Sequence, residues 1–472
     1  MARNPPVEIL FLLLDELEYT SDQLPLLQVC RNWNIALCAQ VLQRNPRLRP
    51  LVQELHCPFL HSREDDESGF YNRALFHELL QSFTDTDNEL VAWEKKLDEM
   101  DCFAWLAVLL VLLPNLRLLD LEWTWCGVAT ETTVWAVSRI ASKSPQGSLP
   151  LQKLQKVSTR ASDMNDRFSI KHFIPFLTLP SMQALHLDGC IDIDTPDDRG
   201  DVFEIPLELR PGISPIRELS LQESNFDNGL RELIPAFAQL ERFEYQHTNI
   251  AEVNENHRNY RCHNFRDALL CQKRSLRELR LNDVGVTKSI GIEEFSDEYS
   301  DYIQESKAQD WFGSLVEFIV LKELRMPVYN LLGSVDGSEP SISLDKILPP
   351  SLETLVLTKV DFTDYSMIEG QLWRLLAARH QQFPSLRKIL LQTFQLEVVD
   401  YDETRWEEYD REEYDLEIPE RARTVFAGVA SSCKEQGIVF DFSRYGDHEV
   451  VANGEVVREV NEIYSQTRQF HY

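Results

Sequence analysis

Two histidines and two cysteines lie close together in the sequence, at His257, Cys262, His263 and Cys271. Imidazole and thiolate groups are preferred ligands of Zn²⁺, so this cluster is the first candidate for a metal site. Its spacing matches no familiar zinc pattern, and a loop leading into a buried helix explains the same residues more simply. We therefore expect no metal site.

Sequence motifs for catalysis and for cofactor binding are also missing. The chain contains no G-x-S-x-G, no H-E-x-x-H and no glycine-rich loop that would hold a phosphate or a dinucleotide. A nucleophilic cysteine or serine would need a base brought close by the fold, which the sequence does not reveal. We expect a protein that is not an enzyme and holds no cofactor; an esterase or protease with a site assembled in space stays open as a third hypothesis.

The strongest pattern lies in residues 182–190. Apolar residues at Met182, Leu185 and Leu187 precede Cys190, which matches the frame L-x-x-L-x-L-x-x-N/C of leucine-rich repeats. Further copies begin at Leu116, Leu154, Ile216, Leu240, Leu276, Leu321, Leu352 and Leu386, and Val52 begins a degraded first copy. The repeats predict an α/β fold: an irregular leucine-rich-repeat solenoid with a curved parallel sheet and helices or irregular returns on its outer face.

The residue between the last two apolar positions of each copy should face away from the core. Read along the chain, these residues are Asp120, His186, Ser220, Glu244, Arg280, Arg325, Val356 and Leu390. The last four form a candidate target-binding patch, in which two arginines grip a carboxylate or phosphate beside an apolar anchor. In the alternative, an acidic loop neutralises both arginines and the C-terminal segment covers Val356 and Leu390. His186 is expected to be a hydrogen-bonded surface residue.

Long insertions separate several of the repeats and carry much of the negative charge. They lie at residues 192–204, 293–310 and 397–420, and the last of them holds twelve carboxylates with aromatic residues interleaved. Such a segment is either a docking surface for a basic partner or a solvated loop kept extended by its own charge. Charge runs are more often the latter, and we favour that interpretation.

Composition limits the partners further. With 47 basic and 77 acidic residues the net charge is −30, so we expect no nucleic acid and no anionic membrane as a partner. Nine cysteines without a C-x-x-C pair are typical of a reducing compartment. The apolar run from Ile9 fails as a signal peptide, and the run 103–113 is too short to span a bilayer. We expect a soluble protein of the cytoplasm and/or the nucleus.

The first 42 residues predict three short helices that differ from the repeats. Asn4 can cap the first helix, residues 20–22 can cap the second, and the third runs from Asn34 to about Leu42. Apolar residues recur at helical spacing in all three segments. A unit of this size usually needs a partner or a larger domain to stabilise it.

The same segment resembles the F-box motif. The residues that carry the resemblance are Pro6, Glu8, Ile9, Leu13, Leu17, Leu24, Leu26, Val29, Cys30 and Trp33. The match departs from the family at Pro5, where leucine is usual. By this resemblance, these residues contact or brace the Skp adaptor and through it a cullin-RING ligase, while the repeats bind an unknown target protein. The alternative is a small helical bundle packed on the repeats, with Cys30 and Trp33 as core residues.

These observations divide the chain into four parts. We assign residues 1–45 to the F-box, 46–115 to a helical linker and N-terminal cap, 116–445 to the repeats with their acidic loops, and 446–472 to a C-terminal hairpin and tail. Asn453-Gly454 is the turn signal of that hairpin. The chain is similar to fungal-type F-box proteins with irregular leucine-rich repeats, which implies the substrate receptor of a ubiquitin ligase. A repeat scaffold outside any ligase is the alternative.

Overall fold

A computed structural model gives the fold of the chain. It describes residues 35–57, 73–99, 101–123, 133, 136–139, 150–161, 168–191, 209–226, 230–247, 261–283, 311–333, 340, 342–360, 363–393, 420–443, 449–452 and 455–458. The chain divides into two compact units. The first comprises Met1–Leu240 and Ile250–His257, and the second comprises Glu241–Asn249 and Arg258–Tyr472.

The first unit contains five parallel strands hydrogen-bonded in the order β1-β2-β3-β5-β7. These strands are β1 (Glu54–Cys57), β2 (Leu118–Trp123), β3 (Lys156–Ala161), β5 (Ala184–Asp188) and β7 (Glu218–Ser224). Two short strands, β4 (Phe168–Ser169) and β6 (Cys190–Ile191), pair separately. The helices are α2 (Ile35–Arg44), η2 (Pro46–Leu51), α3 (Arg73–Phe83), α4 (Asp87–Asp98), α5 (Cys102–Leu112), η3 (Ile170–Phe173), α7 (Ile174–Leu177), α8 (Leu230–Leu233) and η4 (Ile234–Ala236).

The second unit contains six parallel strands in the order β8-β9-β10-β11-β12-β13. They are β8 (Arg242–His247), β9 (Glu278–Asp283), β10 (Glu323–Pro327), β11 (Thr354–Val360), β12 (Lys388–Thr393) and β13 (Val439–Ser443). The helices are α9 (Cys262–Leu269), η5 (Leu270–Gln272), α11 (Val328–Leu332), α12 (Leu344–Ile347), α13 (Tyr365–Gln382), α14 (Glu420–Val425) and α15 (Ala427–Glu435). Strands β14 (Glu449–Ala452) and β15 (Glu455–Arg458) pair antiparallel, as the predicted hairpin requires, and the predicted turn Asn453-Gly454 lies outside the described residues.

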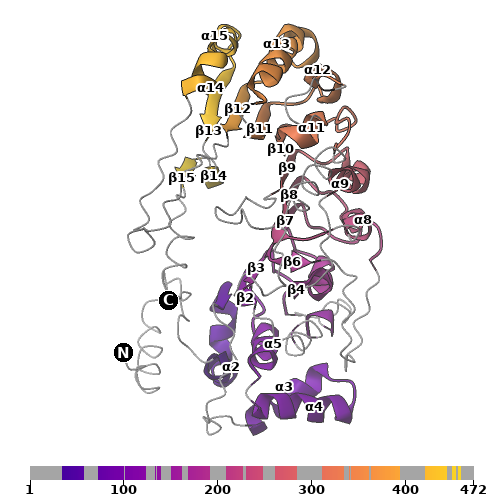
Figure 1. Cartoon of the computed structure of the whole chain (residues 1–472). Helices are drawn as coiled ribbons and strands as arrows, with labels where there is room; N and C mark the ends of the chain where they lie inside the picture. The colour runs from indigo at the N-terminus through magenta and orange to yellow at the C-terminus, as the bar shows by residue number, and fades with distance from the viewer. Residues whose placement is uncertain are drawn as a thin grey trace, which may run out of the picture. The chain divides into compact units, whose positions relative to one another are not determined.

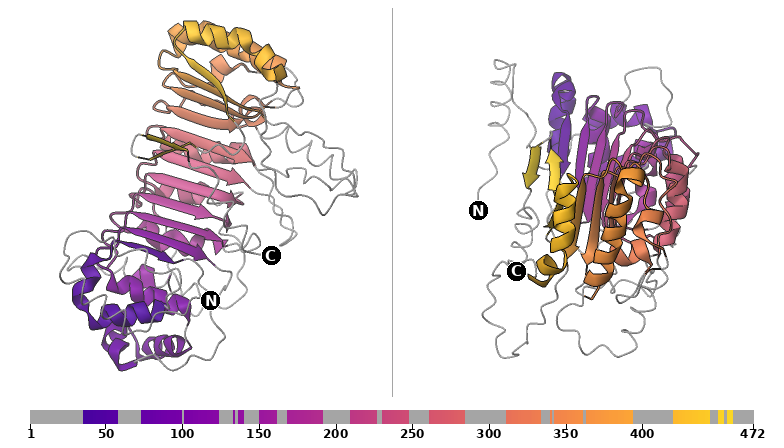
Figure 2. Two further views of the ribbon diagram at one scale, coloured as in Figure 1. Left: turned by 90° about the vertical axis from the view of Figure 1, so that its left-hand side faces the viewer. Right: turned by 90° about the horizontal axis from the view of Figure 1, so that it is seen from above.

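Apolar residues of the repeat frame build the core of each unit. In β9 and β10, Leu279, Leu281, Leu324 and Met326 are all fully buried, whereas the residues between them are half-buried. The strands therefore alternate between a face packed on the core and a face turned the other way. Helices α9, α11 and α12 lie on the core side of the strands in the second unit (Figure 1), and the other face is seen from the front in Figure 2 (left).

The apolar sequence predicts one helix over residues 97–113, and this prediction is wrong in its start. The structure has two helices there, α4 and α5, and Asp101 forms the N-cap of the second because its side chain accepts the backbone N–H groups of Phe103 and Ala104. Thr86 caps α4 in the same manner through the N–H of Glu89. Nearly all of α5 is buried, which fits its apolar sequence.

The sequence also predicts one helix over residues 419–435, but the structure has two helices there, α14 and α15, which are separated at Phe426. The ring of Phe426 is buried and packs against Tyr365, Phe440 and Phe442. Apolar residues at 438–442 predict a strand, and the structure has β13 there, which pairs in parallel with β12 as one more strand of the sheet.

The α/β class and the parallel sheet with helices are confirmed and fit a solenoid-like fold. The first two predicted F-box helices and the three acidic insertions lie outside the described residues. None of the helices in the described part of the chain combines the length and apolar character that a membrane crossing requires.

Candidate binding face of the strands

The four predicted target-binding residues form one row across four neighbouring strands of the second unit. Arg280 of β9 is in register with Arg325 of β10, which is in register with Val356 of β11 and then with Leu390 of β12. All four point away from the core, since their neighbours along each strand are buried leucines, isoleucine or methionine. The structure thus brings together residues that are up to 110 positions apart in the sequence.

Arg280 is held by carboxylates of its own and the adjacent strands. Its Nε and Nη2 atoms lie 2.9 and 2.7 Å from one oxygen of Glu323, and Nη2 lies 3.7 Å from Glu278. Burial lowers the pKa of Arg280, but Glu323, Glu244 and Glu278 together raise it by more, so the net shift is upward. The electrostatic potential at Arg280 is therefore dominated by these three carboxylates.

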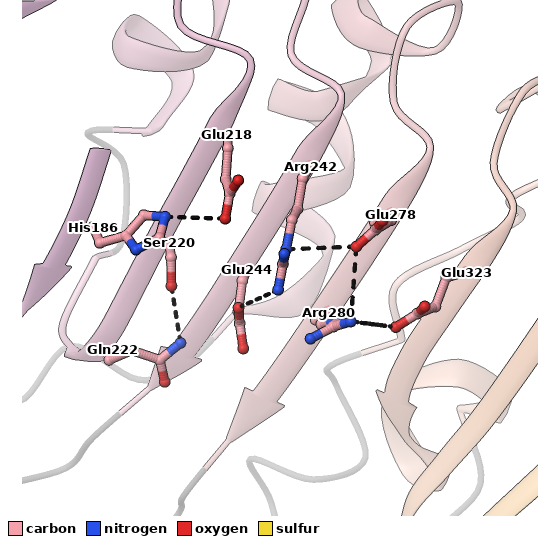
Figure 3. A network of polar contacts seen from close by, with 9 residues as sticks. All are labelled: His186, Glu218, Ser220, Gln222, Arg242, Glu244, Glu278, Arg280 and Glu323. Atoms are coloured by element: carbon pink, nitrogen blue, oxygen red, sulfur yellow. Dashed lines mark hydrogen bonds and ion pairs between the residues drawn. The ribbon is translucent and has the colours of Figure 1, made fainter. Parts of the chain in front are cut away.

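Arg242 extends this arrangement to β8. Its guanidinium lies 3.6 Å from Glu244 and 3.5 Å from Glu278. Figure 3 shows the resulting series, in which Arg242 stands between Glu244 and Glu278 and Arg280 stands between Glu278 and Glu323. We call these five residues the charge ladder. Each side chain in it is between 20% and 37% exposed, so its ion pairs are partly shielded from water.

Sequence reasoning missed Arg242, Glu278 and Glu323. They stand two positions before Glu244, Arg280 and Arg325, so the strand period places them on the same face. Considering two residues in each repeat instead of one would have found them. The pairing that makes the ladder still needed the register, in which Arg242 is opposite Glu278 and Glu278 is opposite Glu323.

Arg325 lies at the boundary between the charge ladder and an apolar area. Its Nη2 atom donates to Oε1 of Gln392 at 3.2 Å, across β11 from its own strand. Val356, between those two strands, is only 7% exposed, and Leu390 is half-buried. The row therefore changes from two arginines at β9–β10 to two apolar residues at β11–β12.

In the first unit, the corresponding face carries two histidine–carboxylate pairs. His186 lies 3.0 Å from Glu218, as expected for a hydrogen-bonded surface residue, and His56 lies 3.1 Å from Asp120. The Ser220 hydroxyl accepts a hydrogen bond from Gln222 at 3.1 Å (Figure 3). These contacts link side chains of neighbouring strands or of one strand.

The remaining predicted sites lie elsewhere or outside the described residues. Cys262 is buried in α9, whereas His263 and Cys271 are exposed, and His257 is not described. The described residues contain no group of three or more histidines, cysteines or carboxylates that could hold a metal ion. The candidate adaptor-binding residues from Pro6 to Trp33 also lie outside the described residues.

Comparison with known proteins supports the repeat interpretation. A search of curated proteins gave no match. The model of a family described as a leucine-rich repeat domain matches residues 73–414, which is more than half of the 472 residues and includes the charge ladder and the row from Arg280 to Leu390. The match does not include residues 1–45, so the F-box resemblance stays a prediction. A repeat domain of this kind indicates a protein-interaction role, and the chain belongs to the leucine-rich repeat domain family.

Proposed function

We propose that the chain is the substrate-recognition subunit of a Skp–cullin–F-box ubiquitin ligase. The observation that carries this proposal is the run from Pro6 to Trp33, which resembles an F-box motif and lies N-terminal to the leucine-rich repeat domain at residues 73–414. The order of a short adaptor-binding segment followed by a protein-binding domain suits a receptor that joins a target to a ligase.

In this role the chain contributes no residue that makes or breaks a bond. The face with Arg280, Arg325, Val356 and Leu390 holds the target protein, and the F-box docks on the Skp adaptor. Ubiquitin transfer is then accelerated by proximity, because the receptor holds a lysine of the bound target close to the ubiquitin-conjugating enzyme that carries the ubiquitin.

The test is binding of the purified full chain to the purified Skp adaptor. We expect the wild-type chain to retain the adaptor, and we expect the double variant Pro6→Ala, Trp33→Ala to lose it, since both residues belong to the F-box resemblance. The variant Arg325→Glu, with an intact F-box segment, is the matched control and should bind the adaptor as the wild type does. Wild-type binding no stronger than that of the double variant would reject the ligase role.

A repeat scaffold outside any ligase is the second candidate. It is favoured by the contact between helix α2, the last predicted helix of the N-terminal segment, and α3, where Gln43 Nε2 donates to the carbonyl oxygen of Leu75 at 3.1 Å. Such packing suits a segment that only caps the end of the repeats. The same adaptor-binding measurement separates the two functions, because a cap without an F-box role retains no adaptor.

A further inference from the structure

The charge ladder on β8–β10 contains one cation fewer than it contains carboxylates. Its order is Glu244, Arg242, Glu278, Arg280 and Glu323, so each arginine is shared between two glutamates and a glutamate stands at each end. The ladder therefore carries one unit of excess negative charge on a face where the side chains are largely shielded.

The two end residues of the ladder differ in how they are bound. Glu323 receives two N–H groups of Arg280 at 2.9 and 2.7 Å. Glu244 has its ion pair with Arg242 at 3.6 Å, which is too long for a hydrogen bond, although its side chain is only 20% exposed. Within the described part of the chain, Glu244 is thus a largely buried carboxylate that has no hydrogen-bond donor at normal distance.

A shielded carboxylate of this kind gains most from a charged donor. Ammonium and guanidinium groups form shorter and stronger hydrogen bonds with carboxylates than neutral donors do. A neutral donor would also leave the excess charge of the ladder in place. Since Arg280 is already bound to Glu323, it cannot turn toward Glu244 without losing both of its short contacts.

We propose that Glu244 receives a lysine or arginine side chain from a basic segment of the target protein. This inference rests on the proposed use of this face for target binding and names the chemistry of its partner. The cation completes the ladder at β8, while the half-buried Leu390 of β12 on the same face contacts an apolar residue of the target.

The strand spacing sets the distance between the two target residues. Neighbouring strands lie about 4.8 Å apart, so β8 and β12 are separated by four spacings, or roughly 19 Å. An extended peptide that crosses the strands advances about 3.3 Å per residue. The basic residue and the apolar residue of the target should therefore be about six positions apart.

A displayed library of random 12-residue peptides, selected on the immobilised full chain, tests this proposal. We expect the wild-type chain to enrich peptides with lysine or arginine about six positions from an apolar residue, and Glu244→Gln to lose that preference. Glu232→Gln is the matched control, since Glu232 is exposed on α8 and the change in net charge is the same. Selection of neutral or acidic peptides, no selection at all, or an unchanged preference in Glu244→Gln would overturn the proposal.

A second measurement uses one enriched basic peptide with a fluorescent label and records its anisotropy with each variant. Glu244→Gln should weaken binding about tenfold, the loss of one charge-assisted hydrogen bond. Arg242→Gln should have the opposite effect and tighten binding, because it leaves the ladder with two excess carboxylates. Equal affinities for these two variants, with both shown to be folded by circular dichroism, would contradict the ladder as the binding site.

The result is separable from the ligase role. Skp adaptor binding should be the same for the wild-type chain and Glu244→Gln. A chain that selects basic peptides but retains no adaptor would reject the ligase role and keep the basic-segment site. A chain that retains the adaptor but selects no basic peptide would keep the ligase role and reject the basic-segment site.

Discussion

Arg280 of β9 binds one carboxylate oxygen of Glu323 on β10 with two of its nitrogen atoms, at 2.9 and 2.7 Å. The two side chains are 20% and 27% exposed. A guanidinium in this position is occupied, so this arginine of the charge ladder stabilises the sheet face and is poorly placed to grip an anion of the target. The other arginine predicted to do so, Arg325, donates to a neutral acceptor, the amide oxygen of Gln392, at 3.2 Å.

Removing the carboxylate of Glu323 should destabilise the second unit. We expect Glu323→Gln to lower the free energy of unfolding by about 1–3 kcal/mol, because it leaves the partly buried Arg280 without its closest partner. The control is Glu353→Gln, which breaks the 2.8 Å pair with Lys322 at the surface and should cost less than about 1 kcal/mol. Urea denaturation of both variants measures the difference, and equal losses would refute the distinction.

The effect of Arg325 on target binding should be easier to separate from stability than the effect of Arg280. Arg325→Glu should reduce capture of the target protein found by proximity labelling while the melting temperature changes little. Arg280→Glu places a fourth carboxylate beside Glu244, Glu278 and Glu323, so it should lower the melting temperature, and its capture of the target then reflects stability as well as contact. Unchanged capture by Arg325→Glu would remove Arg325 from the binding face.

Two glycines should respond to the same substitution in opposite directions. Gly333 ends α11 with φ of +63°, and a Cβ atom there would lie 3.1–3.3 Å from the ring and Cβ of Trp311. Gly333→Ala should therefore destabilise the protein by about 1–2 kcal/mol. Gly370 lies exposed within α13 with open space around it, and Gly370→Ala should stabilise by roughly 0.5–1 kcal/mol. Thermal unfolding followed by circular dichroism measures both changes, and shifts of the same sign would be the contrary result.

Stability should fall at high pH through Cys433 on α15. Burial raises the pKa of this thiol to about 11, although Arg379 lowers it in part. An unfolded thiol has its pKa near 8.5, so the folded state binds the proton more tightly. The stability that this tighter proton binding contributes is fully present below the pKa of the unfolded thiol, and it is lost as the pH rises toward 11.

The measurement is the free energy of unfolding in urea at pH 8 and at pH 10.5. The decrease between the two values should be smaller for Cys433→Ala than for the wild-type chain, whatever the absolute stability of the variant. The same decrease in both proteins would show that Cys433 does not contribute.

The sequence predicted the strands well because their signal is local. Each copy of the repeat places two leucine-like residues on one side of a strand, and pairs such as Leu279 and Leu281 or Leu355 and Leu357 are fully buried. That alternation also located the row from Arg280 to Leu390, since parallel strands in register bring equivalent positions together.

The contacts on the face could not be predicted in the same way. Whether Arg280 meets Glu323, an acidic loop or a target depends on the conformation of long side chains on adjacent strands, which the repeat pattern does not encode. The helix boundary at Asp101 failed for a related reason, because the apolar run 103–113 was extended backward over a residue whose side chain begins a new helix. Hydrogen bonds of polar side chains decided both cases, a cross-strand contact at Arg280 and a local cap at Asp101.

Strand β13 is the last described strand of its sheet, and its outer edge affects whether two copies of the chain can pair. The N–H of Val439 donates toward β12, so the alternating amide of Phe442 points to the open edge, where it donates to the carboxylate of Asp441 at 2.8 Å. A strand from another copy would have to displace this bond and approach a negative charge. The end of the repeats therefore discourages the chain from polymerising with itself, although Val439 is 57% exposed there.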